Sequence, residues 1–354
     1  MHLPIAITMG DPAGIGPEII AKAFRDAPGI TEGCFVAGDV ASLRRAAAWI
    51  TGPGDVQLPV AEITQASDAL SVPTGCIPVL QVVRAGPLVA VGVVSAQAGT
   101  SAAESVLWAA DAALHGDVSA IVTAPLHKEA LAAAGAPHNG YPGHTEMLQA
   151  RAAENRGVSL RELPVRMMLA NDELRTVLVS IHMALRDAIE AVTFANVLET
   201  LQITHAALIP VLGRVPRIAV AGLNPHAGEG GLFGREEIDT IAPAMAQASA
   251  QGLDVHGPYA PDTVFMRARA LPGLVREFDV VVAMYHDQGL IPVKYLGVDK
   301  GVNVTLGLPL VRTSPDHGTA FDIAGTGTAD AASLIEAIRM ARQLCAPVAA
   351  RTTS

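Results

Sequence analysis

Short apolar runs alternate along the chain with longer segments in which apolar residues recur every three or four positions. The short runs, rich in Val, Ile and Ala, predict strands over Ile5–Thr8, Cys34–Gly38, Ala120–Thr123, Val177–Ile181, Ile218–Ala221 and Val280–Met284. The longer segments predict helices over Glu18–Asp26, Ser42–Ile50, Ala102–His115, Ala188–Ala206, Glu236–Ala250 and Ala332–Leu344. Because this alternation is typical of βαβ units, the pattern predicts an α/β fold with mostly parallel sheets.

The chain has 354 residues, which exceeds the size at which one hydrophobic core usually stops growing. We therefore expect two lobes with a cleft between them, in an α/β/α arrangement. The segment Thr51–Gly92 is punctuated by Pro and Gly, which indicates strands and loops at one edge of the first lobe. Only 4% of the residues are aromatic although 50% are hydrophobic, so Ala, Val, Leu and Ile must fill the core.

The formal net charge of -10 at pH 7 argues against a nucleic acid partner, because binding a phosphate backbone requires clustered Lys and Arg. The three cysteines, Cys34, Cys76 and Cys345, lie far apart without metal-type spacing, as expected in a reducing compartment. The sequence begins without the basic region and cleavage site of a signal peptide, and no apolar run reaches the roughly 18 residues that cross a bilayer. These features predict a cytoplasmic protein with no membrane partner.

Polar clusters follow five of the predicted strands, at the ends where open α/β sheets bind ligands. They comprise Met9–Glu18, Ala124–Lys128, His182, Asn224–Gly231 and Tyr285–Gly289. The glycines between Gly10 and Gly16 resemble a dinucleotide fingerprint, but Pro12 and the spacing break the G-x-G-x-x-G pattern. A tight turn that caps the helix at Glu18 explains them equally well.

Three histidines, His182, His226 and His286, stand at or just beyond predicted strand ends. Three neutral imidazoles with an open fourth position form a workable divalent metal site, and such a metal polarises a hydroxyl or carbonyl oxygen. Their wide separation carries no local metal signature, so independent loop or core histidines remain the alternative.

Several further residues suit an anionic substrate. Lys294, Asn303 and Arg312 follow His286, and an arginine fork holds a carboxylate or phosphate through two hydrogen bonds. Solvated surface charge is the alternative for them. His144 and Thr145 would present an imidazole and a hydroxyl at a helix N-terminus, where simple capping is the alternative.

Taken together, these motifs resemble the 4-hydroxythreonine-4-phosphate dehydrogenase (PdxA) family of NAD-dependent oxidative decarboxylases. The matching blocks occur in the family's order along nearly the whole chain, which makes the resemblance specific. They are Gly10–Pro17, Gly143–Glu146, Asn224–Glu229, Tyr285–Gly289, Asn303–Gly307 and Arg312–Ala320.

The resemblance implies roles for the residues already singled out. It makes His182, His226 and His286 the ligands of one divalent ion, Zn, Mg or Co. It makes His144, Thr145, Lys294, Asn303 and Arg312 the substrate-binding residues, with Lys294 also counted as catalytic. In this family the active site lies at the interface of a homodimer and draws metal ligands from both subunits.

The stretch Asp316–Gly325 is similar to the adenosine-binding loop of isopropylmalate and isocitrate dehydrogenases. This resemblance implies their fold, with the active site in the interdomain cleft, and NAD or NADP binding without a Rossmann domain. His317 and Asp322 are then the candidates for the adenosine end of the cofactor. We expect residues 1–142 plus 303–354 to form a first domain on the cofactor side, and residues 143–302 a second domain on the metal and dimer side.

The expected activity is a metal-dependent, NAD(P)-linked oxidative decarboxylation of 4-phosphohydroxy-L-threonine, which gives 3-amino-2-oxopropyl phosphate and CO2 for pyridoxal phosphate biosynthesis. Asp262 and Asp287 are candidates for the general base or for orienting the histidines. Asp11 and the pair Tyr141–Pro142 are more similar to a sister branch that acts on 4-phospho-D-erythronate and 4-phospho-D-threonate in sugar-acid catabolism. A zinc hydrolase and a phosphometabolite-binding protein are the alternatives from other classes.

Overall fold

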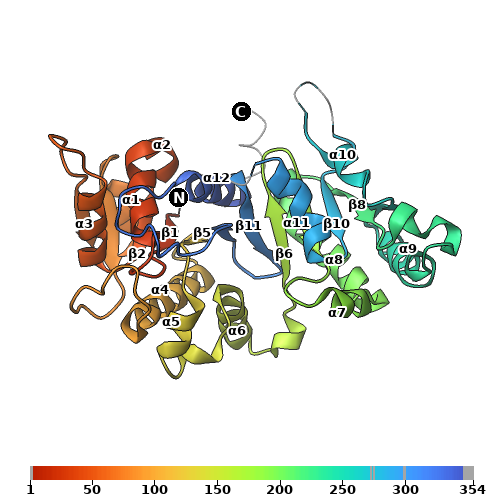
Figure 1. The fold of residues 1–354 in the computed structure, drawn as a ribbon, viewed down its shortest axis with the longest axis horizontal. Helices are drawn as coiled ribbons and strands as arrows, with labels where there is room; N and C mark the ends of the chain where they lie inside the picture. Colours follow the sequence, from red (N-terminus) through yellow and green to blue (C-terminus); the bar gives the residue numbers. More distant parts are fainter. Residues whose placement is uncertain (1–2, 272, 274–275, 298–299, 346–354) are drawn as a thin grey trace. The chain divides into compact units, whose positions relative to one another are not determined.

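The computed structural model describes residues 3–271, 273, 276–297 and 300–345, which form two compact α/β units (Figure 1). The first unit consists of the described residues of Met1–Pro164 together with Leu308–Cys345, and the second consists of those of Val165–Gly307. The α/β fold predicted from the hydrophobic pattern is confirmed in both.

The sheet of the first unit has the strand order β3-β4-β2-β1-β5-β12, and every pairing in it is parallel. All four residues of β1 and of β5 are buried, as expected for strands covered on both faces. The bounds are β1 Ile5–Thr8, β2 Cys34–Gly38, β3 Val60–Ile63, β4 Ile77–Gln81, β5 Ala120–Thr123 and β12 Arg312–Pro315.

Helices cover both faces of this sheet (Figure 1). The Ala-rich α4 packs on β1, β2 and β5, and α5 and α6 pack on α4. On the other face α12 packs on β5 and β12, while α1 packs on α3 and α12. The bounds are α1 Gly16–Asp26, α2 Pro28–Thr31, α3 Val40–Trp49, η1 Ala66–Ser71, α4 Ala96–His115, α5 Lys128–Ala133, η2 His138–Gly140, α6 His144–Arg156, η3 Leu160–Glu162 and α12 Ala332–Cys345.

The sheet of the second unit has the order β11-β6-β7-β10-β8-β9. Strand β6 pairs antiparallel with both β11 and β7, whereas β7, β10, β8 and β9 are parallel. The bounds are β6 Arg166–Ala170, β7 Arg175–Leu178, β8 Arg217–Ala221, β9 Asp254–Tyr259, β10 Val280–Ala283 and β11 Val302–Leu306.

Helix α8 packs on β6, β7 and β11, and α10 and α11 pack on β10 (Figure 1). The bounds are α7 Leu185–Glu190, α8 Phe194–Leu212, η4 Pro225–Gly231, η5 Glu237–Ile241, α9 Ala242–Ala250, α10 Val264–Ala268 and α11 His286–Tyr295. Among the described residues of the chain, no helix combines the length and the apolar character that crossing a membrane requires.

Each unit contains a point at which its strand order reverses. In the first, the chain runs from β1 to β2 on one side and later reaches β5 on the other side of β1. In the second, it runs from β8 to β9 and then returns to β10 on the other side of β8. Ligands of open α/β sheets bind outside the carboxyl ends of the strands at such points.

The limits of the two units differ from the predicted domain boundaries at 142/143 and 302/303. Helix α6 packs on α4 in the first unit, and β11, which contains Asn303, pairs with β6 in the second. Residues 346–354 of the predicted first domain lie outside the described part of the chain. The predicted cofactor, metal and dimer sides stay predictions.

Candidate functional site

The three predicted metal ligands follow three neighbouring strands of the second unit. His182 comes after β7, His286 begins α11 directly after β10, and His226 lies in the turn after β8. Because β7, β10 and β8 are adjacent and parallel, their carboxyl ends meet at one edge of the sheet. The strand order reverses between β8 and β10, because the chain runs from β8 to β9 on one side and returns to β10 on the other.

Two of these imidazoles converge. The ring centres of His182 and His286 lie 5.6 Å apart, close to the roughly 5.3 Å expected for two imidazoles on one tetrahedral zinc ion. Both line a cavity of about 280 Å3 together with Tyr285 and Asp287. Asp287 Oδ1 lies 2.7 Å from His286 Nδ1, which orients the ring. The donor chemistry and spacing of this pair fit a divalent transition metal.

His226 is not part of that pair within one chain. Among the residues that the structure describes, no group of three or more His, Cys, Asp or Glu side chains is placed to hold a metal ion. The His226 ring instead lies 6.1 Å from that of Phe233, and the residue is exposed. A complete site therefore needs ligands beyond His182 and His286.

The turn that holds His226 has a strained backbone. Residues 226–230 all have positive φ, between 44° and 80°, a region that non-glycine residues rarely occupy. The buried carboxylate of Glu237 braces this turn by accepting the backbone N–H groups of Leu223 and Asn224, each at 2.7 Å. Such strain persists only where surrounding contacts enforce it, and it concentrates at functional sites.

One further side chain, that of Gln288, links two strand ends of this site. Its side chain accepts the N–H of Met284 at 2.7 Å and donates to the carbonyl of Gly222 at 2.8 Å. Gln288 therefore connects the end of β10 to that of β8, a role that the sequence pattern did not predict. A larger cavity of about 550 Å3 is lined by both Asp262 and Asp287. The two candidate bases thus share one cavity.

In the first unit, Arg312 is buried at the start of β12. Its Nε and Nη2 donate to Thr123 Oγ1 at 3.1 and 2.7 Å, and burial lowers the pKa of the guanidinium to about 10. His144 begins α6, and burial, followed by the charge of Arg312, lowers the pKa of His144 to about 3. The structure therefore brings His144 and Arg312 together.

The capping alternative for His144 and Thr145 is wrong. The residue that caps α6 is Gly143, and no side chain accepts a capping hydrogen bond there. Glu146 lies in the first turn of α6, and its charge opposes the lowering of the Arg312 pKa. The predicted substrate residues are thus divided, with His144, Thr145 and Arg312 in the first unit and Lys294 and Asn303 in the second.

The candidate adenosine residues, His317 and Asp322, are both exposed on the segment of residues 316–331 that joins β12 to α12. This segment packs on the turn after β1, where Ile15 N donates to the carbonyl of Thr319 at 3.0 Å. A Cβ atom at Gly14 would come within 2.9 Å of that carbonyl oxygen, so the turn needs glycine there. The glycines after β1 therefore provide close packing.

Asp11 and His127 follow β1 and β5, the strands that flank the reversal point of the first unit. Asp11 is fully buried, its Oδ1 accepts the N–H of Ala13 at 2.8 Å, and burial raises its pKa. The His127 ring stacks on Phe321 with ring centres 4.6 Å apart. No role for His127 was predicted from the sequence.

Comparisons with known proteins identify relatives over almost the whole chain. Residues 31–341 match the family described as pyridoxal phosphate biosynthetic protein PdxA. The chain is 51% identical to 4-hydroxythreonine-4-phosphate dehydrogenase of Beijerinckia indica, over 97% of this chain and 96% of the relative. It is 47% identical to D-threonate 4-phosphate dehydrogenase of Salmonella typhimurium, over 96% of this chain and 98% of the relative.

A solved structure gives the same result for the fold. The crystal structure of 4-hydroxythreonine-4-phosphate dehydrogenase from Klebsiella pneumoniae superposes with a TM-score of 0.83 at 41% identity, covering 97% of this chain and all of that one (100%). These names bear out the expected class, a dehydrogenase, over a hydrolase or a binding protein.

Proposed function

The chain belongs to the PdxA family, and we propose that it catalyses the NAD(P)-linked oxidation and decarboxylation of a small phosphorylated hydroxy acid. The observation that carries this proposal is the match to named dehydrogenases over 97% of the chain. The substrate that we propose is 4-phosphohydroxy-L-threonine, with 3-amino-2-oxopropyl phosphate and CO2 as products. The reaction would take place in the cytoplasm.

A second candidate substrate is 4-phospho-D-threonate, or its isomer 4-phospho-D-erythronate. The relative at 47% identity that is named D-threonate 4-phosphate dehydrogenase favours this candidate. The two kinds of substrate share the phosphate, the carboxylate and the C3 hydroxyl, and they differ in an amine or a hydroxyl at C2. The same chemistry therefore serves both.

His182, His226 and His286 would hold the divalent metal, which we propose to be Zn, Mg or Co. When bound, such an ion supplies charge stabilisation to the oxygen of the hydroxyl that is oxidised. Support comes from the 5.6 Å spacing of the His182 and His286 rings and from the strained turn at His226. Asp287, hydrogen bonded to His286, orients that imidazole.

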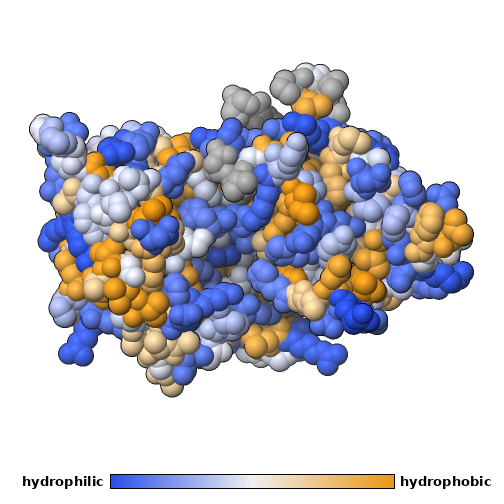
Figure 2. Space-filling model, in the orientation of Figure 1, coloured by the Kyte–Doolittle hydropathy of each residue, from blue (hydrophilic) through white to orange (hydrophobic). Residues whose placement is uncertain are grey.

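The active form would be a homodimer, because one chain brings only two of the three histidines together. Large apolar side chains near the histidines are exposed in the second unit, and Figure 2 shows hydrophobic residues as separate patches on a largely hydrophilic face. Such patches are typical of protein interfaces. Near the histidines they include Met183 (46% exposed), Leu185 (59%), Leu232 (73%) and Phe233 (50%).

The remaining residues have separate roles in binding the substrate, in the reaction and in binding the cofactor. Arg312, Lys294 and Asn303 bind the anionic and polar groups of the substrate, with neutral His144 beside the arginine and Thr145 next to His144 in α6. Asp262 would take the proton of the C3 hydroxyl, and NAD or NADP, when bound, would supply the acceptor for the hydride of C3. The resulting β-keto acid loses CO2, the electron pair of the broken C1–C2 bond forms an enolate across C2 and C3, and a proton from water adds at C2 to give the ketone. His317 and Asp322 bind the adenosine end of the cofactor.

The test is to follow NADH and NADPH absorbance with the purified protein, added divalent metal and the three phosphorylated hydroxy acids. We expect reduction of one cofactor with at least one substrate, together with stoichiometric release of CO2. A protein that reduces neither cofactor with any of the three, at any added metal, would disprove the proposal. Release of inorganic phosphate without cofactor reduction would point to a hydrolase.

A further inference from the structure

The segment of residues 316–331, all of which the structure describes, joins β12 to α12 through turns. Thr326 Oγ1 bonds to the carbonyl of Ile323 at 2.6 Å and to Thr328 Oγ1 at 2.7 Å. Asp330 accepts the N–H of Ala332, the first residue of α12, at 2.8 Å. These bonds are local. They shape short turns but do not attach the segment to the sheet.

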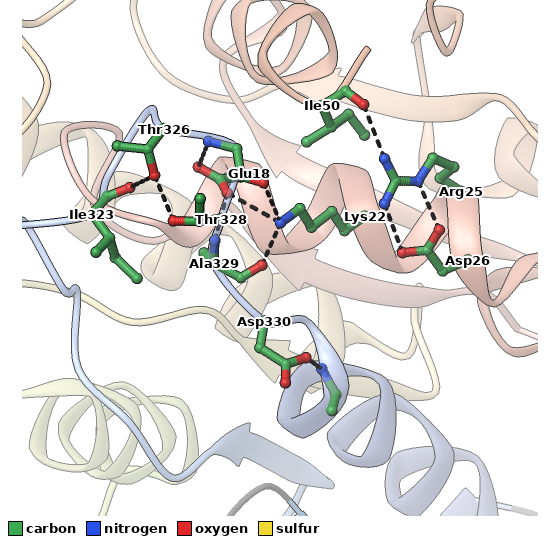
Figure 3. A network of polar contacts seen from close by, with 12 residues as sticks. Glu18, Lys22, Arg25, Asp26, Ile50, Ile323, Thr326, Thr328, Ala329 and Asp330 are labelled. Atoms are coloured by element: carbon green, nitrogen blue, oxygen red, sulfur yellow. Dashed lines mark hydrogen bonds and ion pairs between the residues drawn. The ribbon is translucent and has the colours of Figure 1, made fainter. Parts of the chain in front are cut away.

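The Ile15–Thr319 hydrogen bond and the His127–Phe321 stack attach the first part of the segment, and two charged side chains of α1 attach its last part (Figure 3). The carboxylate of Glu18 accepts the N–H of Ala329 at 2.8 Å and that of Gly327 at 3.3 Å. The ammonium of Lys22, one helical turn later, donates to the carbonyls of the same two residues, at 2.8 Å for Gly327 and 2.5 Å for Ala329. Lys22 and Glu18 also lie 3.3 Å apart as an ion pair.

This pair is buried on a rigid support. The side chain of Glu18 is 0% exposed and that of Lys22 only 11%. Ile19, Ile20 and Phe24 anchor α1 in the core. Buried charges are stable only when they are paired and hydrogen bonded, so both side chains require the backbone of the segment to stay in place. Because the four contacts are to backbone atoms, they fix the path of the chain.

We propose that Glu18 and Lys22 are positioning residues for dinucleotide binding. They hold the segment at Gly327 and Ala329, and so fix the chain that follows His317 and Asp322 before the cofactor arrives, which binding then does not have to order. This inference rests on the proposed function, because it assigns NAD or NADP to the segment. It separates cofactor affinity, which depends on the pair, from substrate affinity, which depends on other residues.

The experiment compares the variants Lys22→Met, Glu18→Gln and the conservative Lys22→Arg with the purified protein of unaltered sequence. We expect Lys22→Met and Glu18→Gln to raise the Kd and KM for the cofactor about tenfold, the effect of roughly one lost charge-assisted hydrogen bond. The substrate KM and the kcat at saturating cofactor should stay within about twofold. Lys22→Arg, which keeps a buried cation, should recover part of the loss.

The matched control is Arg166→Met in the second unit. Arg166 is 13% exposed and pairs with Glu199 at 2.6 Å, so its loss removes a similar ion pair far from the segment in sequence. We expect this variant to lower the melting temperature without changing cofactor Kd. If Lys22→Met behaves in the same way, the pair is merely structural and the inference is wrong.

Two outcomes separate this inference from the proposed function. If the unaltered protein binds and reduces the cofactor and the variants have the same cofactor Kd, the inference is wrong but the proposed function stands. An unaltered protein that neither binds nor reduces NAD or NADP overturns both. Should Lys22→Met not fold, Lys22→Gln and Glu18→Gln give the same comparison by NADH fluorescence titration.

Discussion

The buried guanidinium of Arg312 lies near enough to the His144 imidazole that its charge, added to the larger effect of burial, lowers the pKa of His144 to about 3. His144 is therefore neutral throughout the physiological range, and one ring nitrogen is available as an acceptor. In the proposed site, Arg312 supplies positive charge while His144 supplies hydrogen bonding alone.

The first prediction concerns the pH dependence of stability. Unfolded His144 takes up a proton near its ordinary pKa of 6.5, whereas the folded protein delays this to about 3. The unfolded state therefore binds more protons between these values, so the contribution to stability is complete above pH 6.5 and is lost as pH falls toward 3. We measure the free energy of unfolding by urea titration between pH 4.5 and 7.5. His144→Gln should flatten its dependence on pH, by at most about 1.4 kcal/mol per pH unit.

The control for this measurement is His115→Gln, because His115 is exposed at the end of α4. It removes one imidazole without touching Arg312. Equal slopes for His144→Gln and the unaltered protein would contradict the prediction.

The second prediction concerns Arg312 and the anionic end of the substrate. Arg312→Lys keeps the positive charge but removes the planar guanidinium group. In the structure, Nε and Nη2 of this group both donate to Thr123 Oγ1. Arg312→Lys should raise the substrate KM by about tenfold or more, with a smaller effect on kcat. Initial-rate kinetics check this, and Thr123→Ser, which keeps the hydroxyl acceptor, is the control. An unchanged KM would remove Arg312 from the substrate site.

Much of the fold could be predicted because buried parallel strands are nearly continuous apolar runs. The predicted bounds of β1, β2 and β5 agree with the structure residue for residue. Strand β12 was not predicted, because its sequence Arg-Thr-Ser-Pro is polar although all four residues are buried. Its polar groups are satisfied by partners distant in sequence, as when Thr313 Oγ1 donates to the carbonyl of Ala337 at 2.8 Å.

One helix prediction merged two elements. The apolar pattern predicted a single helix over Ala188–Ala206, but the chain breaks after α7 and starts again at α8. Thr193 caps the new helix by accepting the N–H of Asn196 at 3.2 Å. A capping Thr inside a continuous apolar pattern is easily missed, because both helices keep the same period.

The sequence located the site less completely than the fold. Strand ends pointed to His182, His226 and His286, but only the strand order shows that they follow three adjacent parallel strands. The role of Glu237 was not predicted, because a single Glu at the start of a predicted helix is usually an exposed, solvated residue. Its role depends on the turn that it braces, which no local pattern reveals.

The third prediction follows from that turn. Glu237→Gln weakens the bonds that hold the backbone of Leu223 and Asn224, so the strained turn should relax and move His226. We expect the affinity for zinc, measured by calorimetry against a competing chelator, to fall by about 10- to 100-fold. Glu236→Gln is the matched control, because the Glu236 carboxylate accepts the side-chain amide of Asn224 at 2.7 Å and backbone N–H groups at Arg235 and Glu236, whereas Glu237 accepts those of Leu223 and Asn224. Equal affinities for the two variants would refute the bracing role of Glu237.

The last prediction separates the two carboxylates that line one cavity. Asp287 lies 2.7 Å from His286 Nδ1, so its carboxylate is already engaged in orienting an imidazole. Asp262 lines the same cavity and follows β9, with no such contact to a histidine among the bonds of the described residues. We therefore expect Asp262 to be the base and Asp287 the orienting residue.

Asn replacements test this division, because Asn is close in shape to Asp but cannot accept the substrate proton. Asp262→Asn should lower kcat by about 100-fold or more while zinc affinity stays unchanged. Asp287→Asn should lower zinc affinity by about tenfold, with much of the kcat recovered when excess metal is added. If excess metal restored Asp262→Asn and left Asp287→Asn inactive, the two roles would have to be exchanged, since only loss of the base is insensitive to metal concentration.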